Sequence, residues 1–336
     1  MRRLLPAVIA LSLLPATSTA AAPPAWEQDD EAIACADTPG NAPKYDPPSA
    51  SAVYDGIFGI GHAVPDAFLN SWVPQGLGTW PNWGGSGSDL LIQSGYNDDA
   101  DRAAIVGIAP GGGVTPIVPL KNPDGTWVNA HVGGVAVVGS WLFVSGQPRS
   151  ADVPTILRFP LSAVRTALAT GNALQAAVEI PLNVGTPNFA ASFIAPDDGT
   201  LWVGTFDEAN RNRMYQFTVG PHGGLDRVGA AGNWRQVPKK AQGLTVTNDH
   251  FIFSTSQHVN YRSNVYVERR GYKYLDGAYP GDLTCFAAPT MSEGITRSNG
   301  ITFLSFESGS YKYRGSALNV ITHLHRAPTS SLTALT

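Results

Sequence analysis

Short apolar runs recur along this chain, separated by turns rich in Gly, Pro, Asn and Asp. In each copy a small residue opens an apolar strand, and a small hydroxyl residue closes the next one. The opening residues are Gly76, Gly134, Ser192, Gly243 and Gly294, and the closing residues are Ser94, Ser145, Thr205, Ser254 and Ser305. Successive opening residues are 58, 58, 51 and 51 positions apart. Short apolar runs bounded by turn residues predict β-strands.

A third apolar run follows in each copy, and the first four copies supply a fourth. Four short strands per repeat predict an all-β fold, a β-propeller with five blades. A β-sandwich is the alternative, but it does not predict five internal copies. Residues 51–336 are expected to form one propeller domain, with blades near 72–120, 131–184, 188–229, 240–276 and 290–326.

The two ends of the repeat predict how the ring closes. The fifth copy lacks an outer strand of its own, so we expect an N-terminal strand over residues 52–60 to pair with blade five. A ring closed in this way has no free sheet edge. One helix is predicted, over residues 162–169, with Ser162 as its N-cap.

Residues 1–20 resemble a secretory signal peptide. Arg2 and Arg3 precede an apolar run over residues 4–14, and small residues follow at 18–20. The apolar run is too short for a membrane span, which needs roughly 20 residues. Residues 21–50 are Pro-rich and predict an irregular arm. We therefore expect a secreted, extracellular protein without a membrane span.

The composition and net charge of the chain limit the kinds of binding partner that we expect. Charged residues make up 14% of the chain, and its formal net charge is −4. Because no basic stripe is present, we do not expect nucleic acid or an anionic membrane as a partner. Cys35 and Cys285 are expected to form a disulfide, as an even count in an exported chain suggests. A cysteine nucleophile or a metal site is the alternative. We expect a monomer without cofactor or metal.

The repeat also predicts which residues meet. In a propeller blade the first strand lines the central channel and the second returns antiparallel, so the start of one and the end of the other share a face. The residues just before the opening positions are Gln75, Gly133, Ala191, Gln242 and Glu293. Two positions past the closing residues come Tyr96, Gln147, Asp207, Ser256 and Glu307. Both sets should surround one mouth of the channel.

That mouth carries the candidate chemistry. Carboxylates in apolar surroundings acquire displaced pKa values, so Glu307, helped by Glu293 or Asp207, is the candidate acid and base. The candidate ligand-binding residues are Gln75, Tyr96, His131, Gln242, His258 and Tyr311. The alternative for Gln75 and Gln242 is hydrogen bonding between blades. The hydroxyl residues that recur in every blade are expected to be structural. His323 and His325 could share a strand face and bind a metal, although a surface role is the alternative.

The pattern over residues 72–326 resembles secreted five-bladed propeller proteins of high-GC Gram-positive bacteria. It is also distantly similar to plant-type glutaminyl cyclases, in which a Gln-Gly-Leu opening precedes a Glu-Ser-x-Gly segment after the second strand. Here Gln75-Gly76-Leu77 is followed by Gln93-Ser94-Gly95, whereas Glu307-Ser308-Gly309 lies in the fifth copy. The resemblance implies a carboxylate role for Glu307.

Two functions follow from these observations. The favoured hypothesis is an extracellular module that binds a small molecule, peptide or glycan at this mouth. The alternative is an extracellular enzyme that uses the carboxylates as acid and base, such as a glutaminyl-cyclase-like acyltransferase or a glycan-cleaving enzyme. The opposite mouth is formed by short turns, so we expect it to be less important.

Overall fold

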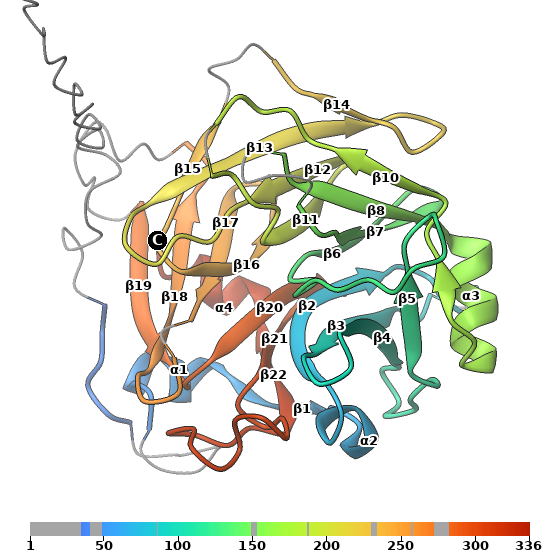
Figure 1. Cartoon of the computed structure of the whole chain (residues 1–336). Helices are drawn as coiled ribbons and strands as arrows, with labels where there is room; N and C mark the ends of the chain where they lie inside the picture. Colours follow the sequence, from blue (N-terminus) through green and yellow to red (C-terminus); the bar gives the residue numbers. More distant parts are fainter. Residues whose placement is uncertain are drawn as a thin grey trace, which may run out of the picture.

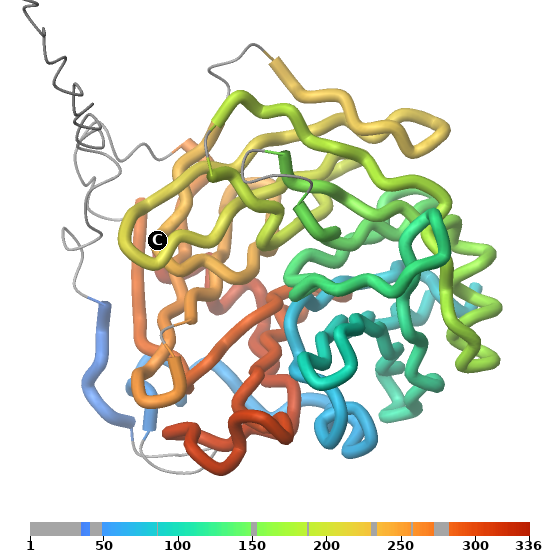
Figure 2. The backbone as a smooth tube through the Cα atoms, in the orientation of Figure 1, coloured from blue at the N-terminus to red at the C-terminus, as the bar shows by residue number. Residues whose placement is uncertain are grey.

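Five sheets, antiparallel except for the outermost pair β5–β9 of one sheet, surround a central channel in the computed structural model (Figure 1 and Figure 2). It describes residues 35–40, 49–85, 87–148, 153–186, 188–229, 234–256, 258–271 and 282–336. The predicted signal peptide and most of the predicted arm lie outside these residues. The five sheets confirm the predicted propeller.

Each blade runs from an inner strand at the channel to an outer strand at the rim. From the channel outward, blade one consists of β2 (Val73–Trp80), β3 (Leu90–Asn97), β4 (Arg102–Ile108), β5 (Val118–Lys121) and β9 (Leu174–Gln175), and blade two of β6 (Val135–Val138), β7 (Trp141–Ser145), β8 (Thr155–Pro160) and β10 (Val178–Pro181). Blade three consists of β11 (Phe193–Asp197), β12 (Thr200–Gly204), β13 (Asn212–Val219) and β14 (Leu225–Arg227), with β15 (Arg235–Val237) also paired with β13. Blade four consists of β16 (Ala241–Val246), β17 (His250–Thr255), β18 (Ser263–Arg269) and β19 (Leu283–Ala288), and blade five of β20 (Ser292–Ser298), β21 (Ile301–Phe306), β22 (His323–Pro328) and β1 (Gly59–Ala63). Apolar side chains fill the spaces between neighbouring blades.

The small opening residues allow the inner strands to approach one another closely. A Cβ atom on Gly294 would lie 2.2 Å from the backbone nitrogen of Leu77 in blade one. A Cβ atom on Gly243 would lie 2.7 Å from the carbonyl oxygen of Glu293 in blade five. Real Cβ atoms do not come this close to backbone, so only glycine fits at these contacts.

Three of the closing hydroxyl residues, Ser94, Ser254 and Ser305, join neighbouring blades, whereas Ser145 and Thr205 accept hydrogen bonds from backbone nitrogens at the start of their own blades. Ser94 Oγ donates to the carbonyl oxygen of Val132 at 2.6 Å, and Ser305 Oγ donates to the carbonyl oxygen of Gln75 at 3.3 Å. Ser94 and Ser305 are fully buried. These contacts confirm that the repeated hydroxyl groups are structural.

The N-terminal part of the domain differs from the prediction. Residues 52–57, expected as a strand, form helix α1 (Ala52–Ile57), and strand β1 begins only at Gly59. Ser51 caps the helix by accepting a hydrogen bond from the backbone of Tyr54, and the rings of Tyr54 and Phe58 stack 4.4 Å apart. Their spacing of four positions places both rings on one helix face, which packs on blades four and five. β1 then pairs antiparallel with β22 at the outer edge of blade five.

Cys35 and Cys285 form the predicted disulfide, with Cα atoms 4.4 Å apart. The bond shows that blade four extends further than predicted. Cys285 lies in β19, the outer strand of blade four, whereas the predicted blade four ended near residue 276. Ala36 makes a parallel bridge to Phe286, so the segment around Ala36 runs along the outer strand of blade four and not along blade five. The reason is that residues 283–288 themselves supply the outer strand of blade four.

Three further helices lie outside the blades: α2 (Asp66–Leu69), α3 (Leu161–Thr170) and α4 (Thr329–Thr333). Helix α3 matches the predicted helix, but its N-cap is Pro160 and not Ser162, and no side chain caps it. None of the helices in the described residues is long and apolar enough to cross a membrane.

Candidate functional site

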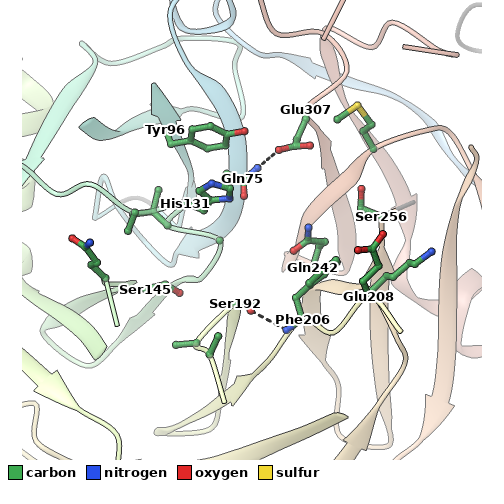
Figure 3. Close-up of a pocket in the computed structure, with 18 of the residues that line it drawn as sticks. Gln75, Tyr96, His131, Ser145, Ser192, Phe206, Glu208, Gln242, Ser256 and Glu307 are labelled. Atoms are coloured by element: carbon green, nitrogen blue, oxygen red, sulfur yellow. Dashed lines mark hydrogen bonds between the residues drawn. The ribbon is translucent and has the colours of Figure 1, made fainter. Parts of the chain in front are cut away.

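A cavity of about 690 Å³ lies at the channel mouth where the inner strands begin and the second strands end (Figure 3). Six residues proposed from the sequence line this cavity: Gln75, Tyr96, His131, Gln242, His258 and Glu307. They come from blades one, two, four and five, and the repeat geometry explains their convergence. The alignment of first-strand starts with second-strand ends therefore located the cavity.

Asp207 and Tyr311 do not line the cavity. The Asp207 carboxylate accepts hydrogen bonds from the backbone nitrogens of Ala209 at 3.0 Å and Asn210 at 2.9 Å. It thus organises its own loop, as a short acidic side chain often does in a turn. Tyr311 is half-buried, and its backbone nitrogen donates to the carbonyl oxygen of Leu69 at 2.7 Å.

Two carboxyl groups of blade five lie together at one side of the cavity. Glu307 lines the cavity and is only 8% exposed, whereas Glu293 is 1% exposed and lies outside the lining. Gln75 Nε2 donates a hydrogen bond to Glu307 Oε1 (Figure 3). Neither carboxyl oxygen of Glu293 has a hydrogen-bond partner of good geometry among the described residues. One carboxyl is therefore presented to the cavity, and the other is enclosed behind it.

Burial raises the pKa of both groups. For Glu307, burial raises the pKa to about 8, although the hydrogen bond from Gln75 and the charge of Lys312 oppose this effect. For Glu293, burial and then the charge of Glu307 raise the pKa well above its ordinary value, and the Ser256 hydroxyl opposes them only in part. Two close carboxylates in dry surroundings cannot easily ionise together. The pair therefore holds at least one proton at neutral pH.

Tyr96 and His131 form an aromatic wall beside Glu307. Their rings are stacked, with centroids 4.3 Å apart and planes 3° from parallel. Lys312 Nζ donates to Tyr96 Oη at 3.1 Å and also contacts Asp98. Burial is the largest effect on the His131 pKa and lowers it below 6.5, so the imidazole is mainly neutral at pH 7. Lys312 Nζ also lies 5.0 Å from the centroid of the buried Tyr96 ring, so the exposed part of the wall is the His131 ring.

Charged side chains lie on the rim formed by blades three and four. His258 Nε2 and Glu208 Oε1 are 2.8 Å apart, and both side chains are exposed. The hydrogen bond from His258 lowers the pKa of Glu208. Lys240 lines the same region. The cavity therefore has a protonated acid on one side and ionised groups on another.

Some lining residues were not proposed from the sequence, among them Asn129, Lys240, Met291 and Tyr313. Tyr313 had a detectable signal, because it lies in the varied segment that follows Glu307. Lys240 and Met291 both have positive φ angles, a backbone property that the repeat alignment did not reveal. Their side chains thus reach the cavity from turns and not from the aligned strand ends.

The predicted histidine pair does not form a metal site. His325 is 2% exposed and its Nδ1 is 2.7 Å from Tyr54 Oη, whereas His323 is half-buried at the start of the same strand. Among the described residues, no group of three or more His, Cys, Asp or Glu side chains could hold a metal ion.

The opposite mouth is also hollow, with a volume of about 540 Å³. It is lined mainly by turns such as 198–199 and 297–300 and by threonine hydroxyls of the inner strands. Thr79 and Thr296 are hydrogen-bonded to each other at 3.0 Å, and Asp89 accepts from Ser298 at 2.6 Å. Its polar groups therefore bind one another, unlike the carboxyl pair of the first mouth.

No family model matches the sequence, and no curated protein matches it. Solved structures that match this chain include Kuenenia stuttgartiensis hydrazine synthase, at 14% identity and a TM-score of 0.34, covering 76% of this chain and 74% of that one. A neuraminidase-like protein from A/bat/Guatemala/164/2009 matches at 9% identity and a TM-score of 0.32, covering 63% of this chain and 55% of that one. The Dos1 propeller matches at 13% identity and a TM-score of 0.28, covering 66% and 52%. The class of protein is thus a five-bladed propeller, defined by its own sheets.

Proposed function

We propose that this propeller is an acid–base enzyme, and that Glu307 gives and takes the proton. The observation that carries the proposal is a carboxyl group that lines a cavity and has a pKa raised to about 8. A general acid works best when its pKa lies near the working pH. Glu307 meets this condition, and Gln75 holds its side chain in place.

The cyclisation of an amino-terminal glutamine is the reaction that we propose to test first. The Gln-Gly-Leu and Glu-Ser-Gly segments lie in blades one and five, which are adjacent in the closed ring. The hydrogen bond between Gln75 and Glu307 brings the two segments together. The segments that carry the resemblance to plant-type glutaminyl cyclases therefore meet at one cavity. This meeting supports the enzyme hypothesis over the binding module.

The proposed reaction uses one carboxyl group for two proton movements. The substrate α-amine attacks the carbon of its own side-chain amide, and the bond from that carbon to the amide nitrogen breaks. Glu307 donates its proton to the departing nitrogen, which leaves as ammonia, and takes the proton that the α-amine loses. No proton is left over, and Glu307 returns to its starting form.

Ammonia release from a glutaminyl peptide tests the proposal. We expect the wild-type protein to release ammonia and to form the cyclic product, which mass spectrometry identifies. Glu307→Gln should reduce the rate about 10²- to 10⁴-fold, the range of general acid–base catalysis. Arg297→Gln, at the opposite mouth, is the matched control and should retain the rate. The absence of ammonia, or equal rates in wild type and Glu307→Gln, would count against this function.

Ligand binding without chemistry is the second candidate, and the stacked Tyr96–His131 wall favours it. Flat aromatic surfaces suit planar or sugar-like groups. Peptide and glycan arrays would then yield a ligand that binds wild type, binds His131→Ala more weakly, and is released unchanged. We also propose that the protein acts outside the cell, as the predicted signal peptide and the Cys35–Cys285 disulfide support.

A further inference from the structure

Glu293 is buried behind Glu307, and the surrounding groups do not satisfy the hydrogen bonding of its carboxyl group. Its carboxyl group is 1% exposed, and neither oxygen has a hydrogen-bond partner of good geometry among the described residues. Buried polar atoms in proteins are nearly always paired, and an unpaired one calls for an explanation such as a bound ion. The Ser256 hydroxyl influences Glu293 but does not complete its hydrogen bonding.

The charged groups around the pair are few. Glu293 faces Glu307, and Glu307 is influenced in turn by Lys312 and Asp98. Lys312 is already bound to Asp98, so its charge is largely balanced. Among the described residues, no cationic side chain forms an ion pair with either glutamate. Within the part of the chain that the structure describes, the pair thus has no ion-pair partner, and a ligand that enters the cavity can supply one.

We propose that this carboxyl pair binds a protonated primary amine of the ligand. Glu307, which lines the cavity, would contact the ammonium group directly as a carboxylate, and Glu293 would keep its proton behind it. An ammonium ion has three donors and one positive charge, which match a buried carboxyl pair better than a neutral group does.

This inference deepens the proposed function and rests on it in one respect: the bound ammonium ion would be the substrate α-amine, which gives one proton to Glu307 before it attacks the amide. Below pH 7 both carboxyl groups of the free protein hold a proton, because burial raises both pKa values. When the ammonium ion binds, the proton of Glu307 leaves the pair and goes to the buffer. Binding should therefore release about one proton per ligand below pH 7. The affinity should then strengthen about tenfold for each rise of one pH unit.

Isothermal titration with L-leucinamide tests the inference. This probe carries a primary amine but no side-chain amide, so it cannot be cyclised. Titrations at pH 5.5, 6.0 and 6.5, in buffers of different ionisation enthalpy, give the number of protons released. N-acetyl-L-leucinamide, which lacks the charge, should bind at least tenfold more weakly. Glu307→Gln should weaken L-leucinamide binding at least tenfold, and Arg297→Gln should leave it unchanged.

Several results would overturn the inference. Binding without proton release, an affinity independent of pH, or equal affinity for the acetylated probe would each show that the pair does not take an ammonium ion. The last comparison needs only the wild-type protein, so it does not depend on the folding of a variant. If L-leucinamide binds with proton release but glutaminyl peptides are not converted, the amine site stands and the proposed reaction fails.

Discussion

The Glu307→Gln substitution is expected to stabilise the protein at pH 8 and to have little effect at pH 4.5. In the folded state burial raises the Glu307 pKa from 4.5 to about 8. In the unfolded state the carboxyl ionises near its ordinary pKa. Between these values the unfolded chain releases a proton that the folded chain retains, so wild-type stability falls as pH rises. Glutamine has no such proton.

The size of the effect follows from the pKa difference. A rise from 4.5 to about 8 corresponds to about 5 kcal/mol of lost stability at pH 8, which is an upper figure because water entry and rearrangement reduce it. We expect Glu307→Gln to recover about 2–5 kcal/mol at pH 8. The substitution preserves an acceptor oxygen for Gln75, so the local hydrogen bond is retained.

Guanidinium unfolding curves at pH 4.5 and pH 8.0, followed by tryptophan fluorescence with the disulfide intact, measure this difference. Glu208→Gln is the control, because Glu208 is exposed and its pKa is lowered. That variant should gain no stability at pH 8. The reasoning is refuted if Glu307→Gln is no more stable than wild type at pH 8, or if its gain is the same at both pH values.

Three further predictions concern the ring and the site. Replacing Cys35 and Cys285 by serine should lower the free energy of unfolding by up to about 5 kcal/mol, as the chain-entropy model gives for a closed loop of this length; an unchanged melting temperature would contradict it. Gly294→Ala should destabilise the fold by about 1–3 kcal/mol, because its methyl group would overlap the backbone of blade one; denaturant unfolding measures this, and a neutral effect would show that the strands can separate. Gln75→Leu should raise the Glu307 pKa further by removing a donor to its carboxylate; a ¹³C titration of labelled Glu307 carboxyl carbon detects the change, and a lower pKa would refute it.

The repeat made the fold and the position of the cavity predictable. Small residues were required at strand openings because neighbouring backbones touch there, as at Gly243 and Gly294. Hydroxyl residues were required at strand ends because they bond backbone of the next blade, as Ser94 does, or of their own blade, as Ser145 does. These needs recur in each blade, so they appear in the sequence as a period. The same period placed Gln75 and Glu307 at one mouth.

Structural features that occur only once in the chain could not be predicted from the sequence repeat. Helix α1 has its own signal, since Tyr54 and Phe58 are four positions apart, but the expected closing strand overlapped it. Asp207 and Glu307 occupy equivalent repeat positions, yet Asp207 binds its own loop and Glu307 enters the cavity. Glu293 and Gln75 occupy equivalent repeat positions with the same irregular register, yet Gln75 lines the cavity and Glu293 is enclosed behind Glu307. How deeply a side chain at a repeated position is buried therefore depends on its local neighbours.

The site depends on the closing of the ring. Gln75 and Glu307 are 232 positions apart in sequence, and they meet only because blade five lies against blade one. The contact of Gly294 with the backbone of Leu77 lies at the same junction, so the spacing of the two inner strands also sets the position of the carboxyl group. A small opening residue at 294 is thus a requirement of the fold and of the site together. If the strands separated, water could enter, the Glu307 pKa would fall, and Gln75 would lose its partner. The ring junction is therefore the element that keeps the acid protonated, although no residue of the N-terminal strand enters the cavity.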